Sequence, residues 1–170
     1  MNNILKNKII TIYNELQRFT KNIVLMNPPA CVSQIQEFEN QYGIQLPLDY
    51  KFLLSLSNGF NLMGDEILGI SYKRKYDLFA TYDYEHYEVS IPMPQYIVPF
   101  SPDGRGNFYC FDTHSPTYDG ESCNIIFWCS NYLYTEYDQP EITHDNFSEF
   151  VLECIIGWTL EDYDYNGNPK

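Results

Sequence analysis

The chain has 170 residues, a length that suits one domain whose core needs neither disulfides nor a metal. Its net charge of −13 is unevenly spread: residues 1–75 carry 8 basic and 6 acidic side chains, whereas residues 76–170 carry 2 basic and 17 acidic ones. So negative a body repels nucleic acid and anionic membranes and speeds the encounter with a basic protein. Acidity of this kind also serves simply to keep a domain dispersed. The lopsidedness favours a basic partner and argues against a nuclease.

The cysteines and the apolar runs indicate a cellular compartment. Five cysteines are an odd number, and three stand among apolar residues, which favours buried thiols in a reducing environment over a disulfide framework. The start of the chain lacks the apolar run of a signal peptide, and no stretch reaches the length of a membrane span. The sequence therefore predicts a cytoplasmic protein.

Residues 1–26 are expected to form an N-terminal helix. Apolar side chains recur there every three or four positions, at Leu5, Ile9, Ile12, Leu16, Phe19 and Ile23. Asn27-Pro28-Pro29 would end this helix. Its remaining face is basic, and we interpret the apolar stripe as packing against the domain in preference to lying on a membrane.

Residues 33–58 predict two short helices that meet at a fixed corner. Ser33 is the expected cap of the first helix, and Gly43 is its expected end. Pro47 suits the first turn of the second helix. Asn58 and Gly59 supply residues that readily adopt the left-handed conformation which stops a helix.

Residues 60–134 predict the sheet region. A first hairpin is expected over residues 60–70, and strands over residues 96–100, 107–112 and 124–129, the first two of these joined by a turn over residues 102–106. Residues 125–129 are apolar on both faces, which predicts a central strand covered on both sides. Residues 72–90 have a helical or loop character that the pattern does not separate.

Residues 146–158 predict a closing helix. Asn146 is its expected cap, and one apolar stripe follows at Phe147, Phe150, Val151, Cys154, Ile155 and Trp158. Residues 161–170 are acidic and have no aliphatic residue, which predicts a flexible tail. The whole reads as an α+β fold: a single domain over residues 1–160, with an antiparallel or mixed central sheet packed against N-terminal helices and a C-terminal helix.

Three groups of residues, in order along residues 30–158, carry a resemblance to a known family. They are Tyr42-Gly43, Leu46-Pro47, Asp49-Tyr50 and Asn58-Gly59; Pro99, Asp103-Gly104 and Tyr109 to Asp112; and Asn146-Phe147 to Phe150-Val151. This pattern resembles the SUKH superfamily (Smi/Knr-like). The resemblance implies an α+β domain without catalytic activity, used mostly by bacteria as an immunity protein against polymorphic toxins, often nucleases. Some eukaryotic relatives serve instead in signalling or cell-wall regulation.

The sequence gives little support to catalysis or metal binding. No close Cys or His pair of the kind that zinc sites use is present, although Cys110, His114, Cys123 and Cys129 could converge. His86, His114 and His144 have no evident nucleophile partner. Asp103 and Asp112 could share a metal, but turn and strand-end roles explain both. We therefore predict no catalytic residue, no metal and no cofactor, and structural roles for the family motif Gly43, Leu46, Pro47, Tyr50, Asn58, Gly59, Asp103, Gly104 and Asp112.

Two stretches interleave tyrosines with acids, over residues 82–88 and 132–138. Tyrosine supplies contact area at low entropic cost, so these stretches predict a protein interface, although inward-facing tyrosines beneath solvated acids would give the same pattern. The hypothesis is an immunity protein that binds and blocks a basic toxin. The residues expected to supply negative charge to this interface are Asp83, Glu85, Glu88, Glu136 and Asp138, and those expected to supply contact area are Tyr84, Tyr87, Tyr134 and Tyr137. The alternative is a regulatory scaffold for a signalling partner. The oligomeric state is left open.

Overall fold

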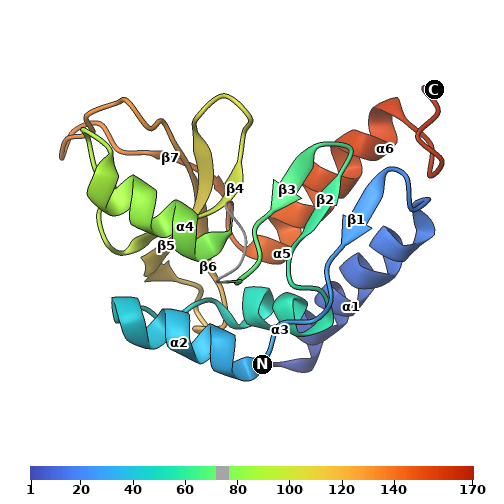
Figure 1. The fold of residues 1–170 in the computed structure, drawn as a ribbon, viewed down its shortest axis with the longest axis horizontal. Helices are drawn as coiled ribbons and strands as arrows, with labels where there is room; N and C mark the ends of the chain where they lie inside the picture. Colours follow the sequence, from blue (N-terminus) through green and yellow to red (C-terminus); the bar gives the residue numbers. More distant parts are fainter. Residues whose placement is uncertain (72–76) are drawn as a thin grey trace.

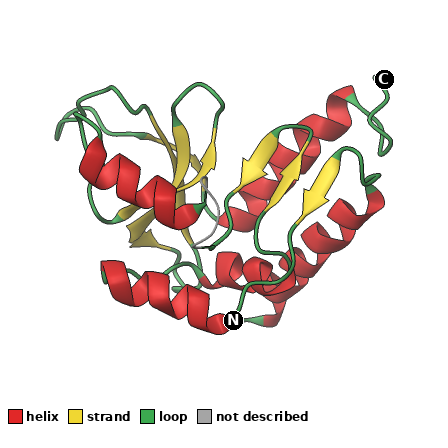
Figure 2. Ribbon diagram, in the orientation of Figure 1, coloured by secondary structure: helices red, strands yellow, loops and turns green. Residues whose placement is uncertain are grey.

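The expected α+β class is confirmed, but with two sheets where one was expected. The computed structural model describes residues 1–71 and 77–170, so the first part of the ambiguous stretch 72–90, which contains the basic run Lys73-Arg74-Lys75, lies outside the described residues. Within them, a three-stranded and a four-stranded antiparallel sheet lie side by side with helices around them (Figures 1 and 2). The division into one domain over residues 1–160 stays a prediction.

Helix α1 (Asn3–Arg18) is shorter than the N-terminal helix expected over residues 1–26. It buries Leu5, Ile9, Ile12 and Leu16 as the apolar stripe predicts. Residues Val24–Met26 instead form strand β1, which pairs with β2 (Phe60–Leu62). The prediction of a helix is wrong there because the strand partner is distant in sequence, and β-branched side chains such as Val24 suit a strand.

The two-helix corner is present, with one cap displaced. Helix α2 (Val32–Tyr42) begins before Ser33, and Gln34 accepts a hydrogen bond of 2.8 Å from the backbone N–H of Cys31. Gly43 ends α2 in the left-handed conformation, with φ of 67°, as expected. Helix α3 (Leu48–Leu56) follows directly after Pro47.

The corner is held by one buried carboxylate. Glu39 of α2 accepts hydrogen bonds from the backbone N–H of Leu46 at 2.9 Å and from Nζ of Lys51 at 2.6 Å. Its side chain therefore joins α2, the connecting turn and α3, and fixes the angle between the two helices.

The first hairpin is confirmed, but its second strand ends earlier in the sequence than expected. Strand β2 pairs with β3 (Asp65–Ile67), so the three-stranded sheet has the order β1-β2-β3. The second strand ends at Ile67, three residues before the end of the expected hairpin at residue 70, and it begins at Asp65 because the turn is confined to residues 63 and 64. Met63, with φ of 55°, and Gly64 occupy that turn.

The four-stranded sheet contains the other predicted strands and one that was missed. Its order is β4 (Ile97–Pro102), β5 (Phe108–Pro116), β6 (Cys123–Trp128) and β7 (Glu141–His144). The expectation of a covered central strand is confirmed for β6: Ile125 packs in the main core, whereas Ile126 and Trp128 pack in a smaller cluster on the other face. Strand β7 lies outside the expected sheet region of residues 60–134. The sequence pattern did not reveal it because this strand is short and half-exposed and carries little apolar signal.

The ambiguous stretch after residue 76 is helical in its described part. Helix α4 (Leu78–Asp83) is capped by Asp77, whose carboxylate accepts from the N–H of Ala80 at 2.9 Å, and it continues as the π-helical segment η1 (Tyr84–Glu88). The buried positions are spaced by three and four residues, at Leu78, Phe79, Tyr82, Glu85 and His86. A helical period thus decides which side chains of this segment face inward.

The closing helix starts where the sequence predicts and runs further. The Asn146 side chain accepts from the N–H of Glu149 at 3.0 Å, and α5 (Phe147–Phe150), η2 (Val151–Gly157) and α6 (Trp158–Asp162) follow without a break. Trp158, expected on the buried stripe, is 54% exposed. The π-helical segment η2 holds more residues per turn than an α-helix, so the phase of the stripe has shifted by residue 158.

The C-terminal residues do not form the expected flexible tail. Residues 161 and 162 end α6, and Tyr163 pairs with Pro169. The ring of Tyr165 packs on Phe19 at 4.9 Å between centroids, and its hydroxyl donates to Glu15 at 2.9 Å. An aromatic anchor therefore holds a segment whose composition suggested disorder.

Candidate protein-binding surface

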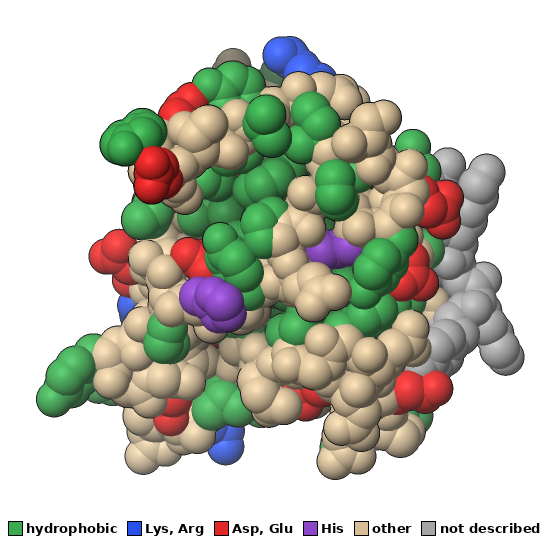
Figure 3. Space-filling model, turned by 90° about the vertical axis from the view of Figure 1, so that its left-hand side faces the viewer, with side chains coloured by type: hydrophobic (Ala, Val, Ile, Leu, Met, Phe, Trp, Pro, Cys, Tyr) green, Lys and Arg blue, Asp and Glu red, His purple; other side chains and the backbone are tan. Residues whose placement is uncertain are grey.

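Two hollows lie around the four-stranded sheet, on the side that carries α4 and the loop over residues 129–140. Hollow A, about 860 Å³, is bounded by Leu68, by η1, by Phe108 near the β4–β5 turn, and by Ser130. Hollow B, about 420 Å³, lies over the smaller apolar cluster and is bounded by Trp128, Tyr134 and Ile142 among others. Figure 3 shows hydrophobic side chains gathered in a hollowed area on this side of the molecule, with acidic side chains around it.

The structure divides the candidate contact residues between these hollows. Asp83, Tyr84, Glu85 and Glu88 line hollow A, all from α4 and η1. Tyr134 and Glu136 line hollow B. Tyr87, Tyr137 and Asp138 line neither hollow and lie on the surface beside them. The stretch over residues 82–88 therefore borders hollow A, and the stretch over residues 132–138 borders hollow B.

Several of the candidate tyrosines have the exposure that a contact residue needs. Tyr84 is 54% exposed, Tyr87 60% and Tyr137 90%. Leu133, which the sequence argument did not single out, is 70% exposed beside them. Exposed aromatic and apolar side chains gathered around a hollow (Figure 3), unlike single ones such as Leu25 or Val32 elsewhere on the chain, are typical of a protein-binding surface. Their exposure could not be read from the residue types, since the same types fill the core.

Glu85 does not belong to the exposed charge that the sequence suggested. It is only 4% exposed, and burial raises the pKa of its carboxyl group. It follows Tyr82 by three residues on the inner face of the helix, so the period of the helix turns it away from solvent. The helical spacing from Leu78 onward was the signal in the sequence that could have revealed this.

Asp83 is half-buried and held in place by a tyrosine of another helix. The hydroxyl of Tyr42 in α2 donates to its carboxylate at 2.7 Å. Burial, together with this carboxylate, raises the pKa of Tyr42 well above its usual value. The contact fixes the start of η1 against α2, and it leaves Asp83 at the edge of hollow A.

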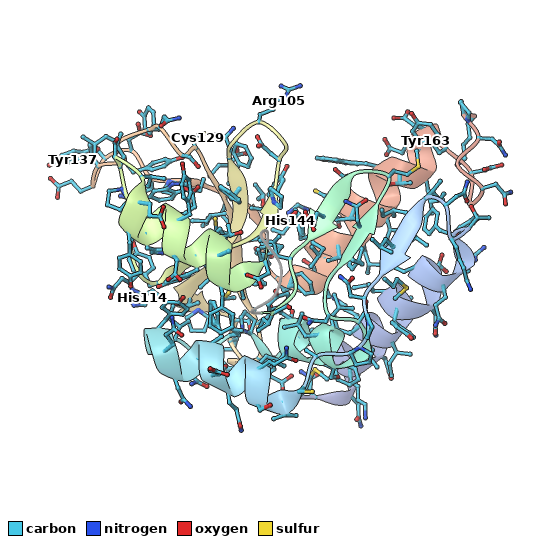
Figure 4. The ribbon with its side chains drawn as sticks, in the orientation of Figure 1. Arg105, His114, Cys129, Tyr137, His144 and Tyr163 are labelled. Atoms are coloured by element: carbon cyan, nitrogen blue, oxygen red, sulfur yellow. The ribbon has the colours of Figure 1, made fainter. Side chains whose placement is uncertain are left out.

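The loop over residues 129–140 is organised by its own tyrosines. The ring of Tyr134 packs on Trp128 at 4.6 Å between centroids, and its hydroxyl accepts from the N–H of Cys129 at 3.0 Å. Burial raises the pKa of Tyr134 to about 12. Tyr132 donates a hydrogen bond to Asp138. Tyr137 projects from the outer tip of this loop (Figure 4), so an inward tyrosine anchors the loop while an outward one remains available.

The histidines are engaged in structural contacts. Buried His86 has Nδ1 at 2.7 Å from the carbonyl oxygen of Tyr82 and Nε2 at 3.0 Å from that of Ile97, and burial lowers its pKa. His114 stacks on Tyr96 with centroids 4.1 Å apart. These contacts keep both rings away from a nucleophile.

His144 lies near a thiol. Its Nε2 is 3.5 Å from Sγ of Cys154, but burial raises the pKa of that thiol to about 11, so it stays protonated at neutral pH. The described residues contain no group of three or more Cys, His, Asp or Glu side chains placed to hold a metal ion.

The family-motif residues of the corner bind the fold together. The Tyr50 hydroxyl donates to the carbonyl oxygen of Leu68 at 2.6 Å, and the Asn58 amide bonds both backbone groups of Ile70, at 2.6 and 2.8 Å. Gly59 has φ of 73°, and a Cβ there would lie 2.5 Å from the carbonyl oxygen of Ile67. These contacts attach α3 to the segment that follows the hairpin.

The remaining motif residues shape the turns of the four-stranded sheet. Asp103 accepts from the N–H groups of Arg105 at 2.7 Å and Asn107 at 2.9 Å, across the turn in which Gly104 has φ of 75°. Asp112 accepts from the hydroxyl of Ser115 at 2.7 Å. Asp103 is therefore a turn-forming residue as expected, whereas Asp112 lies within β5 and not at the strand end that the sequence suggested, and each has local partners.

Fold and surface together define an α+β domain with an acidic, aromatic face and two hollows. A comparison with protein-family models matches residues 29–153 to the SMI1 / KNR4 family (SUKH-1). The match covers most of the chain, and the protein belongs to this family. SUKH domains generally act as non-catalytic immunity proteins that bind a cognate toxin. A comparison with curated proteins gives no match. No helix in residues 1–71 and 77–170 is long and apolar enough to cross a membrane.

Proposed function

We propose that this protein is a bacterial immunity protein that binds a cognate toxin domain, a basic nuclease, and neutralises it by covering its active site without chemistry of its own. The observation that carries the proposal is the side of the molecule bearing η1 and the loop over residues 129–140. There, Tyr84, Tyr87, Leu133 and Tyr137 are exposed among carboxylates. Family membership supports the same class of function.

The charge of this face suits a cationic partner. Glu88, Glu136 and Asp138 are exposed there, and the described residues that line the two hollows include no lysine and no arginine. A nuclease binds a polyanion, so its active-site cleft carries positive potential. Complementary potentials speed the encounter, and the desolvated tyrosines then slow dissociation.

The anchoring of the aromatic side chains lowers the cost of binding. Tyr134 is fixed between Trp128 and the N–H of Cys129, and Asp138 is fixed by Tyr132. A loop that is ordered before the encounter loses less conformational entropy on binding. The surface is therefore suited to a tight complex as well as to a fast one.

The test is co-expression of this chain with the toxin domain encoded beside its gene, combined with direct binding of the purified pair across a series of salt concentrations. We expect survival of the host, and an affinity that falls as salt rises. A folded protein that neither rescues growth nor binds would overturn the proposal, and would favour the regulatory scaffold instead.

A further inference from the structure

At the floor of hollow A lies a buried carboxylate with an unused hydrogen-bonding atom. Glu85 is 4% exposed, and its Oε2 has no hydrogen-bond partner among the described residues. The hydroxyl of Ser130, which also lines hollow A, is likewise buried without a partner in the described part of the chain. Two polar groups that face the same cavity are thus unsatisfied together.

Such a pair is costly unless something binds it. A buried carboxylate without a partner loses its hydration and gains nothing in return. The hydroxyl of Ser130 makes a weak side-chain contact with the Glu85 carboxyl group, which lowers the pKa of Glu85 against the larger effect of burial, but the geometry of this contact leaves both Oε2 and the serine hydroxyl without a full hydrogen-bond partner. A bound cation with several N–H donors would satisfy both acceptors.

The walls of hollow A suit the stem of such a cation. Leu68, Val89 and Phe108 provide apolar surface, and Asp83 and Glu88 add negative charge at its border. Aliphatic stems of basic side chains pack on surfaces of this kind while the charged head reaches its partner. Arg105, at the tip of the β4–β5 turn, points away from the body of the molecule (Figure 4), and it does not line the hollow.

We propose that hollow A receives an arginine side chain of a protein partner, with its guanidinium group against Glu85 and Ser130 and its stem along the apolar wall. That the partner is a protein rests on the proposed function. A guanidinium fits better than an ammonium group, because its planar fork donates to separate acceptors at once and stacks on an aromatic ring such as that of Phe108. The pocket would make one partner arginine a centre of the interface.

The first experiment does not need the toxin. The ¹⁵N-labelled full chain is titrated with acetyl-Gly-Arg-Gly-amide and, separately, with the citrulline and lysine counterparts of that peptide. We expect saturable shifts at the amides of Glu85 and Ser130 with the arginine peptide, weaker binding of the lysine peptide, and none of the neutral citrulline peptide. Equal shifts with arginine and citrulline peptides, or none with either, would overturn the proposal.

Matched variants test whether Glu85 itself is responsible for binding of the arginine peptide. Glu85→Gln removes the charge and keeps the shape, whereas Glu161→Gln removes the same charge from an exposed position on α6. We expect Glu85→Gln to weaken arginine-peptide binding by about tenfold or more, and Glu161→Gln to leave it unchanged. Equal weakening by the two variants would show a general charge effect and would contradict the pocket. Ser130→Ala provides an independent reading, with an expected loss of several fold.

Binding measurements with the toxin distinguish the arginine-pocket proposal from the proposed immunity function. If the cognate toxin binds, Glu85→Gln should raise the dissociation rate by about 30-fold or more while the association rate stays within about twofold. If the toxin binds wild type and Glu85→Gln equally, the arginine pocket is wrong and the immunity function stands. If the toxin does not bind but the arginine peptide does, the pocket stands and the proposed function falls.

Discussion

Asp49 and Ser122, 73 residues apart, are joined by a buried hydrogen bond of 2.7 Å from the serine hydroxyl to Oδ2 of the carboxylate. The same serine oxygen accepts from the N–H of Phe147 at 3.3 Å, so α3, the residue directly before β6 and α5 meet at one polar point inside the core. Asp49 is fully buried, and burial raises its pKa to about 6.

This contact predicts a dependence of stability on pH. The folded state holds the Asp49 proton up to its raised pKa of about 6, whereas an aspartate in the unfolded chain loses its proton near the usual pKa of about 3.9. The folded state therefore binds more protons between these values, and stability should fall as pH rises from 4 to 6, by about 2 kcal/mol from this group.

Asp49→Asn removes that titration. Chemical denaturation at a series of pH values should show a stability profile that is flatter between pH 4 and 6 than that of the wild type. Ser122→Ala should steepen the profile, since the hydrogen bond from Ser122 lowers the pKa of Asp49 against the effect of burial. Profiles that superimpose for wild type and Asp49→Asn would show that Asp49 titrates normally in the folded state.

Gly59 and Gly120 predict different costs for the same substitution. Both have left-handed backbone, with φ of 73° and 68°, but a Cβ at Gly59 would meet the carbonyl oxygen of Ile67 at 2.5 Å, whereas a Cβ at Gly120 would meet nothing within 4 Å. Gly120→Ala should cost about 1 kcal/mol from the backbone conformation alone.

Gly59→Ala should cost about 3 kcal/mol or more, since the backbone must also move to relieve the clash. Thermal unfolding of the two variants checks this difference. Equal destabilisation would mean that the close approach of Gly59 to β3 is relaxed at no cost.

Exposed carboxylates on the proposed interface should control the rate of association. Reversing Glu88 and Glu136 to lysine should slow binding of a basic toxin by about tenfold at low salt and flatten its salt dependence, while the melting temperature stays nearly unchanged. Stopped-flow kinetics measure this rate. Glu161→Lys is the control, and an equal slowing by that variant would remove the special role of this face.

Glu85→Lys should behave differently from these surface reversals. Because Glu85 is 4% exposed, a lysine there would need to bury an ammonium group beside Cys110, and we expect a clear loss of stability. Thermal melts of Glu85→Lys and Glu88→Lys, at positions three residues apart in η1, compare a buried with an exposed charge reversal. An unchanged melting temperature for Glu85→Lys would show that this side chain turns readily to solvent.

The C-terminal segment should contribute to stability through Tyr165. Its ring contacts Phe19, the guanidinium of Arg18 lies 4.1 Å from the ring centroid, and its hydroxyl bonds Glu15. Tyr165→Ala should cost about 2 kcal/mol by urea denaturation. Tyr118→Ala, at a fully exposed position, should have no effect, and similar values for both variants would argue that the segment is not held.

Local chemistry was enough to predict much of this protein. Asn146 caps its helix, Gly43 ends α2 in a left-handed conformation, and residues 125–128 form a strand with apolar contacts on both faces. Each of these features depends on neighbours within a few positions, or on the chemical character of one short segment. The ordered set of such features also carried the family resemblance, which the family comparison confirms.

Features that depend on contacts between residues distant in sequence were decided only by the tertiary structure. Val24–Met26 continues an apolar helical pattern, yet it forms a strand because β2, whose paired residues lie 34 to 38 positions further along the chain, offers it a partner. Tyr165 is held by Phe19 and Glu15 in a segment whose composition predicts disorder. No local pattern carries information about such partners, since the energy that favours them comes from contacts that exist only after folding.

The candidate surface shows the same division. Residue types alone indicated an acidic, tyrosine-rich interface, but they did not separate buried Glu85 from exposed Glu88, or anchored Tyr134 from projecting Tyr137. The sequence by itself determined the chemical character of this surface and the elements that carry it. Only the tertiary structure decided which groups face water and which line a hollow, because burial depends on what packs opposite each side chain.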